Sequence, residues 1–122
     1  MSTSPPYRVI DVYEHLGRIG VMAEFGCETD FVSKMKKFRD MMRDVTLQIA
    51  AEAPETLEQL LEQTWIKDDA KRVQELIDEI SRHFREKVVV TRFVRWTTDE
   101  TSRPVDETPE PPHAPALIQR VG

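Results

Sequence analysis

Residues 20–34, GVMAEFGCETDFVSK, contain the point at which the periodicity of this chain changes from that of a strand to that of a helix. Up to Cys27 the apolar residues occupy every second position, which is typical of a strand that buries one face. From Phe31 onward they recur every three or four positions, which stacks them on one side of an α-helix. Residues 27–32 are therefore predicted to form a strand-to-helix corner at the protein surface.

Upstream of this corner, the alternation continues back to Arg8 with a break around Gly17. Its members are Ile10, Val12, Leu16, Ile19, Val21, Ala23, Phe25 and Cys27. Two alternating runs on either side of a glycine predict a β-hairpin over residues 8–27, because glycine readily supplies the positive φ of a tight turn.

Downstream, three helices are predicted. The first runs from about Asp30 to Glu52 and is stopped by Pro54. Its apolar stripe comprises Phe31, Met35, Phe38, Met42, Val45 and Ile49. Thr56 and Gln59 form a capping-box pattern for a short helix over residues 57–62. A third helix is expected from about Asp69 to Glu86, with acidic residues at the positive end of its dipole.

The last element, Lys87 to Trp96, is predicted to be a strand with apolar groups on both faces. Val88, Val90, Val94 and Trp96 fall on one face by strict alternation, and Val89 and Phe93 on the other. We therefore expect an α+β domain in which a three-stranded antiparallel sheet packs against helices. The second face of that sheet meets another subunit or partner, or is covered by the tail or the short helix.

Composition divides the 122 residues into three parts and limits the class of protein. Residues 1–6 and the acidic, proline-rich tail 97–122, which holds five of the eight prolines, are expected to be disordered around a folded unit at 7–96. The net charge of −5 argues against nucleic-acid binding. No apolar run is long enough for a membrane span, and neither a signal peptide nor a pair of cysteines is visible, so a cytoplasmic location is expected.

The residues of covalent chemistry and of metal or cofactor binding are sparse. The four glycines fit no phosphate-binding spacing, and the three histidines share no metal-ligand spacing with Cys27, so neither a cofactor nor a metal is expected. Cys27, His15 and Asp30 can supply a nucleophile, a base and an orienting acid if the hairpin brings them together. Cys27 also continues the strand alternation, and is then a small core residue.

The corner residues each have two interpretations. Phe31 is either the first residue of the buried helical stripe, which the spacing favours, or an exposed aromatic wedge offered to another protein. Asp30 also suits an N-terminal cap. The basic residues that follow, Lys34, Lys36, Lys37 and Arg39, form a solvated face or contact an acidic partner.

The stretch from Gly20 to Lys34 closely resembles the signature of the elongation factor Ts family, which centres on Thr-Asp-Phe-Val. The resemblance continues in order to residue 96, through Ile49-Ala50-Ala51, the segment 61–68 (LEQTWIKD) and Arg92-Phe93-Val94-Arg95. Relative to the family we expect a minimal core, the dimerisation domain, without the N-terminal ubiquitin-associated-like domain and without the long helical insertion after Ala53. Gly26 and Trp65 also stand where Asn and Phe are usual.

The resemblance implies guanine nucleotide exchange on elongation factor Tu, without covalent chemistry, by a core that forms a homodimer. The residues matching the exchange wedge are Asp30 and Phe31, with Thr29, Val32 and Lys34 as neighbouring contacts. Val89, Phe93 and Trp96 are expected at the dimer interface. The alternative is a reduced dimeric interaction module that binds elongation factor Tu or another protein without promoting exchange.

Overall fold

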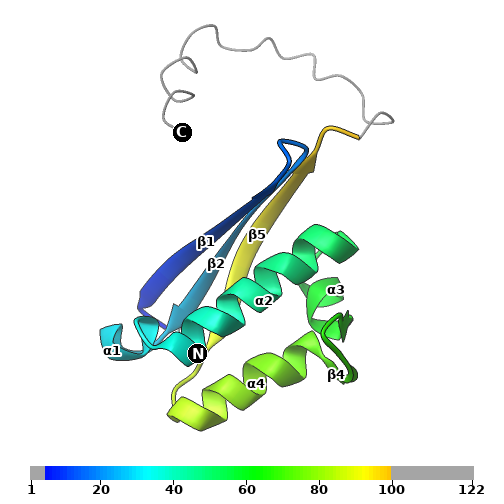
Figure 1. The fold of residues 1–122 in the computed structure, drawn as a ribbon. Coiled ribbons are helices and arrows are strands. Elements are labelled where there is room, and N and C mark those ends of the chain that lie inside the picture. Colours follow the sequence, from blue (N-terminus) through cyan, green and yellow to red (C-terminus); the bar gives the residue numbers. More distant parts are fainter. Residues whose placement is uncertain (1–4, 100–122) are drawn as a thin grey trace, which may run out of the picture.

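The computed structural model describes residues 5–99, which form one sheet, four helices and a small hairpin. Strands β1 (Tyr7–His15), β2 (Ile19–Cys27) and β5 (Val89–Thr97) form an antiparallel sheet in the order β1-β2-β5. Helices α1 (Asp30–Ser33), α2 (Lys36–Glu52), α3 (Leu57–Glu62) and α4 (Val73–Phe84) lie on one side of it (Figure 1). The predicted α+β class and three-stranded antiparallel sheet are confirmed.

The β1–β2 hairpin forms where the alternation predicted it. Tyr7 pairs with Cys27 and His15 pairs with Ile19, so the two strands are in register over their whole length. Leu16 and Gly17 both have positive φ, at 53° and 70°, and the Arg18 N–H donates to the His15 carbonyl at 2.8 Å. A turn with two successive positive φ values matches the right-handed twist of the strands, which explains the glycine here.

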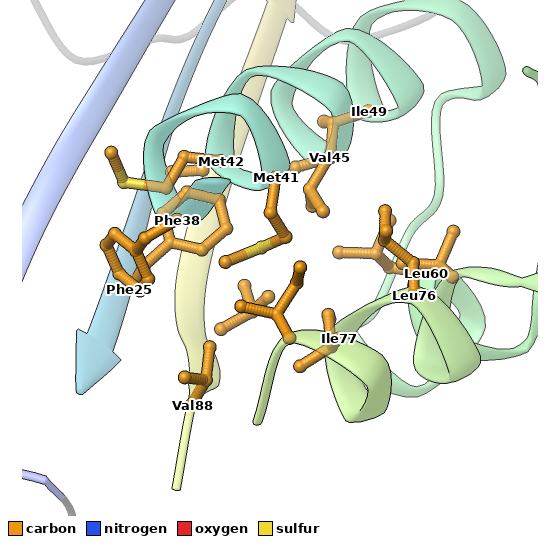
Figure 2. Packing of buried hydrophobic residues seen from close by; sticks show 14 of the residues in the cluster. Phe25, Phe38, Met41, Met42, Val45, Ile49, Leu60, Leu76, Ile77 and Val88 are labelled. Carbon is orange, nitrogen blue, oxygen red and sulfur yellow. The ribbon is translucent and has the colours of Figure 1, made fainter. Parts of the chain in front are cut away.

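The core lies between the inner face of the sheet and helices α2 and α4. Its largest fully buried side chains include Phe25, Phe38, Met41, Ile49 and Leu60. Figure 2 shows Phe25 of the sheet beside Phe38 of α2, while Leu60 and Leu76 lie together between α3 and α4. Helix α2 packs on this face and α4 packs on α2, while the opposite face of the sheet carries exposed apolar side chains.

Two predicted helix boundaries were wrong. The first predicted helix is interrupted at Lys34 and Met35, because Met35 has extended backbone angles and α2 begins only at Lys36. The third begins at Val73, since residues 64–72 instead form a hairpin of β3 (Thr64–Trp65) and β4 (Asp68–Arg72). The predicted helix over 57–62 is confirmed, and the Thr56 hydroxyl accepts a hydrogen bond from the Gln59 N–H at 3.0 Å.

A buried amide holds the unexpected hairpin against α2. Gln48 is fully buried, and its side-chain Nε2 donates to the Gln63 Oε1 at 3.1 Å and to the Thr64 carbonyl at 3.0 Å. Its Oε1 accepts from the Ile66 N–H at 2.9 Å. These three bonds satisfy an amide that burial would otherwise penalise, so they fix where the chain turns after α3.

The predictions for the two ends of the chain fall mostly outside the described residues. Residues 1–4 of the predicted disordered N-terminus and residues 100–122 of the predicted tail are among those not described. Pro5 is buried, and its carbonyl accepts a hydrogen bond from Arg8 Nε at 3.0 Å. Within residues 5–99, no helix is both long and apolar enough to cross a membrane.

Candidate functional site

The corner that joins β2 to α2 is a single turn of helix, α1, flanked by two residues with extended backbone angles, Thr29 and Met35. Thr29 has extended backbone angles, and its Oγ1 accepts a hydrogen bond from the Val32 N–H at 3.2 Å, which caps the N-terminus of α1. The Ser33 hydroxyl donates to the Asp30 carbonyl at 2.6 Å. Asp30 therefore occupies the first helical position, one residue after the cap.

Phe31 projects from this turn into solvent with 69% of its surface exposed. The helical spacing favoured burial, and that prediction was wrong because the break at Met35 separates α1 from the axis of α2. The rest of the stripe on α2 is buried as expected, from Phe38 to Ile49. Of the two interpretations of Phe31, the structure is compatible only with the exposed aromatic.

Asp30 and Lys34 lie beside Phe31 and are also exposed. The Lys34 Nζ is 3.1 Å from Asp30 Oδ2, an ion pair between side chains that retain 72% and 59% of their exposure. Pairs of this kind contribute little to stability and are readily exchanged for a partner's groups. The corner thus offers an aromatic ring flanked by one acid and one base.

Val32 and Thr29 hold the corner from the inside. Val32 is only 3% exposed and belongs to the hydrophobic core, so its expected contact with a partner is corrected to an anchoring role. Thr29 is exposed, but its hydroxyl accepts the bond that caps α1 and donates one to the Glu86 carboxylate. The ring of Phe31 therefore projects from a backbone that is fixed two residues before it, at Thr29, and one residue after it, at Val32.

The sequence analysis did not identify the residues after α4 that hydrogen-bond to the corner. The Glu86 carboxylate, just after α4, accepts hydrogen bonds from the Glu28 N–H at 3.0 Å and the Thr29 N–H at 3.1 Å. It also accepts from the Thr29 hydroxyl at 2.6 Å. In return, the Lys87 N–H donates to Glu28 Oε2 at 2.7 Å. These contacts join positions nearly 60 residues apart, and no local pattern signals them.

The combination of Cys27, His15 and Asp30 is not assembled. His15 pairs with Ile19 at the far end of the hairpin, about 27 Å along the strand from the level of Cys27. Cys27 is fully buried, and its thiol donates to the Thr29 carbonyl at 3.3 Å. Burial, and after it the charge of Glu86, raises the pKa of the Cys27 thiol. These features fit the core interpretation, and the described residues contain no cluster of three potential metal ligands.

The open face of the sheet is the second exposed surface of the domain. We use this name for the side that carries the exposed apolar residues Ile10, Val12, Met22, Val94 and Trp96. Val89 pairs with Gly26, and Trp96 pairs with Gly20. Two of the three expected interface residues therefore lie on the open face. The third, Phe93, is corrected: it pairs with buried Ala23 and packs against the core on the helix side.

Fold and site together define a small α+β domain with an exposed aromatic ring at the corner between β2 and α2. The sequence profile of the family described as elongation factor TS matches residues 28–104, more than half of the chain. The chain belongs to the elongation factor Ts family.

Individual relatives agree with this assignment. Elongation factor Ts of Myxococcus xanthus is 34% identical, with 75% of this chain and 63% of the relative covered. Elongation factor Ts of Desulforamulus reducens is 34% identical over 75% and 64%, and that of Thermodesulfovibrio yellowstonii is 28% identical over 76% and 69%. The chain therefore spans somewhat less than two thirds of the length of the first two.

Proposed function

We propose that this chain promotes the release of GDP from elongation factor Tu during translation elongation in the cytoplasm, with Asp30 and Phe31 as the wedge. The observation that carries the proposal is the 69% exposure of Phe31 on a fixed corner, within the stretch that resembles the family signature. A rigid, exposed aromatic side chain is the type of residue that most often dominates a protein interface.

Thermodynamic linkage explains how such a wedge accelerates GDP release without covalent chemistry. If the bound chain weakens the affinity of elongation factor Tu for GDP, GDP must weaken the affinity for the chain by the same ratio. The wedge therefore has to fit the nucleotide-free form better than the GDP-bound form. Phe31 supplies apolar area for that differential binding, and Asp30 supplies a carboxylate that competes for groups around the phosphate and cation site.

The test is the release of fluorescent GDP from elongation factor Tu in the presence of the wild-type chain and of Phe31→Ala. Loss of a central aromatic contact costs about 2 kcal/mol or more, so we expect affinity for the nucleotide-free protein to fall about 30-fold. The free energy of unfolding should change by less than about 0.5 kcal/mol, because the ring is exposed.

Leu16→Ala is the matched control, since Leu16 is 79% exposed and lies on the turn at the opposite end of the sheet. It should leave both GDP release and binding unchanged. The proposal is wrong if the wild-type chain does not accelerate GDP release even at saturating concentration.

A second function is favoured by the open face, which exposes apolar residues from all three strands. In this alternative the chain is a homodimeric interaction module that binds elongation factor Tu, or another protein, without promoting exchange. Binding to nucleotide-free elongation factor Tu with no change in the rate of GDP release would favour the module over the exchange factor.

A further inference from the structure

We propose that Glu86 is a positioning residue for the exchange wedge: its carboxylate fixes the backbone from which Phe31 and Asp30 project. This inference deepens the proposed function and rests on it. It assigns a role to a residue between α4 and β5, which is remote in sequence from the corner that it orders.

Four hydrogen bonds join residues 28–29 to residues 86–87, and we call this set the corner clamp. One Glu86 oxygen accepts from two successive backbone N–H groups, those of Glu28 and Thr29, and the other accepts from the Thr29 hydroxyl. The Lys87 N–H returns a bond to the Glu28 carboxylate. Hydrogen bonds to an ionised acceptor are stronger than neutral ones, so the clamp is well suited to hold an irregular segment.

The corner clamp supplements contacts that are mostly local, since the cap at Thr29 and the bond from Ser33 to Asp30 lie within the turn itself. Helix α1 has only four residues, and an isolated turn of helix is unstable in water. Phe31 is mostly exposed, so its own packing contributes little to its position. Val32 anchors the turn on the core side. The corner clamp fixes the segment just before the turn, and these two attachments together determine the direction of the Phe31 side chain.

A fixed wedge binds better than a mobile one. Ordering a loose segment on binding costs conformational entropy that is subtracted from the affinity, and small errors in position reduce the rate of a step that depends on geometry. Loss of the corner clamp should therefore reduce exchange activity by making the position of Phe31 less defined. Glu86 exerts this effect through its bonds to Glu28 and Thr29.

The experiment compares Glu86→Ala and Glu86→Gln in the full chain. Alanine removes all three acceptor contacts, and we expect the affinity for nucleotide-free elongation factor Tu to fall about tenfold. Glutamine keeps one acceptor oxygen for the two N–H groups, so this variant should recover to within about threefold of wild type. Glu79→Ala is the matched control, because Glu79 lies on α4 and pairs with Lys71 at 2.6 Å, away from the corner. It should bind as wild type does.

A double-mutant cycle with Phe31→Ala separates positioning from a general loss of stability. If Glu86 positions the wedge, Glu86→Gln should cost less in the Phe31→Ala background than in wild type, and the remainder should act through Asp30. Equal losses in both backgrounds would overturn the inference. Because the glutamine variant is mild, the cycle remains informative if Glu86→Ala does not fold.

Amide hydrogen exchange supplies a readout that does not require elongation factor Tu. In Glu86→Gln, and more strongly in Glu86→Ala, exchange at Glu28 and Thr29 should accelerate while the amides in the middle of α2 remain protected. Unchanged exchange at these two positions would show that Glu86 does not order the corner. Failure of the wild-type chain to release GDP would instead contradict the proposed function and leave the amide result to decide the role of Glu86.

Discussion

Phe31 and Leu16 are exposed to a similar degree, but their backbones are held in different ways. A single exposed apolar side chain is ordinary on a protein surface and needs no explanation. The difference is that Phe31 lies between a capped, clamped residue and a buried one, Thr29 and Val32. Leu16 occupies the tip of a turn, held by hydrogen bonding of its neighbours alone. Rigidity beneath an exposed ring is what distinguishes the corner as the proposed binding site.

Cys27 provides a prediction about pH at the residue scale. Its pKa is raised in the folded protein, so between the unfolded value of about 8.5 and the higher folded value the native state retains a proton that the unfolded chain has lost. By linkage, this contribution to stability is fully present below about pH 8.5 and disappears as the pH rises further. The free energy of unfolding, measured with urea from pH 7 to pH 10, should therefore decline less steeply in Cys27→Ala than in wild type.

Alkylation of the thiol checks the same interpretation independently. Because Cys27 is fully buried and protonated at neutral pH, the folded chain should react slowly with iodoacetamide, and the urea-unfolded chain should react at the rate of a free thiol. Fast labelling of the folded chain would contradict the burial and revive the reactive thiol. If the free energy of unfolding declined equally with pH in wild type and in Cys27→Ala, the linkage argument would be wrong.

Residue identities predicted part of the site and missed the rest for a physical reason. Local signals placed the corner correctly, because alternation ends at Cys27, but the predicted cap was wrong by one residue: Thr29 caps the helix and Asp30 is its first residue. Phe31 was a further exception, since its spacing from Met35 continues the stripe of α2 and only the extended backbone at Met35 removes it. The corner clamp was invisible, because a hydrogen bond between positions 28 and 86 depends on how the whole chain folds.

At the scale of the elements, a β-bulge in β5 decides which side chains face the helices. Glu24 pairs with Arg92 and Phe25 pairs with Val90, so Thr91 is an extra residue in the strand. Strict alternation assumed no such insertion and therefore placed Val90 and Val94 on the same face. The bulge reverses the pattern beyond it, which turns Phe93 inward and leaves Val94 on the open face.

Glu24 holds this bulge and provides the second pH prediction. Its carboxylate accepts from the Thr91 hydroxyl at 2.6 Å, from Arg92 Nε at 3.2 Å and from Arg8 Nη1 at 3.3 Å. The bonds from Thr91 and then Arg92 lower the pKa of Glu24, against the opposing effect of burial. Its stabilising contribution is therefore present above the ordinary carboxyl value near 4.5 and is lost as the pH falls through the lower folded value.

Glu24→Gln tests this assignment by urea unfolding at several pH values. The variant should be less stable than wild type at pH 7, and the difference should shrink toward zero near pH 2, where both side chains are neutral. Leu16→Gln, which changes no titratable group on the exposed β1–β2 turn, serves as the control, and any difference from wild type should be the same at both pH values. A deficit for Glu24→Gln that is the same at both pH values would contradict an electrostatic role.

The β3–β4 hairpin shows the limit of reading elements from sequence alone. Asp68 and Asp69 precede an apolar helical stripe and suit the start of a helix, so the pattern placed the helix there. In the structure Asp68 Oδ1 accepts from the Ala70 N–H at 3.0 Å, and the first turn of α4 is delayed until Val73. Gln48 donates two hydrogen bonds to this segment and accepts one from it, and these long-range contacts outweigh the local preference.

At the scale of the whole molecule, the helices among residues 5–99 leave one face of the sheet uncovered. Figure 1 shows α1 at one end of the sheet and the β1–β2 turn at the opposite end, with α2 crossing the sheet between them. The open face is therefore a different surface from the corner, and a partner on the open face leaves Phe31 free. The proposed homodimer and the proposed contact with elongation factor Tu therefore use separate surfaces of the chain.

Val94→Asp tests the proposed homodimer through that face. Val94 is paired with Met22 on the central strand, so a second copy that covers the open face has to bury this position. An unpaired carboxylate buried in an interface costs about 3 to 5 kcal/mol, which predicts more than 100-fold weaker dimerisation, measured by sedimentation velocity over a range of concentrations. Leu16→Asp introduces the same charge on the turn and should dimerise as the wild type does. A wild-type chain that sediments as a monomer at every concentration would contradict the dimer, whereas a dimer that survives Val94→Asp would place its interface elsewhere.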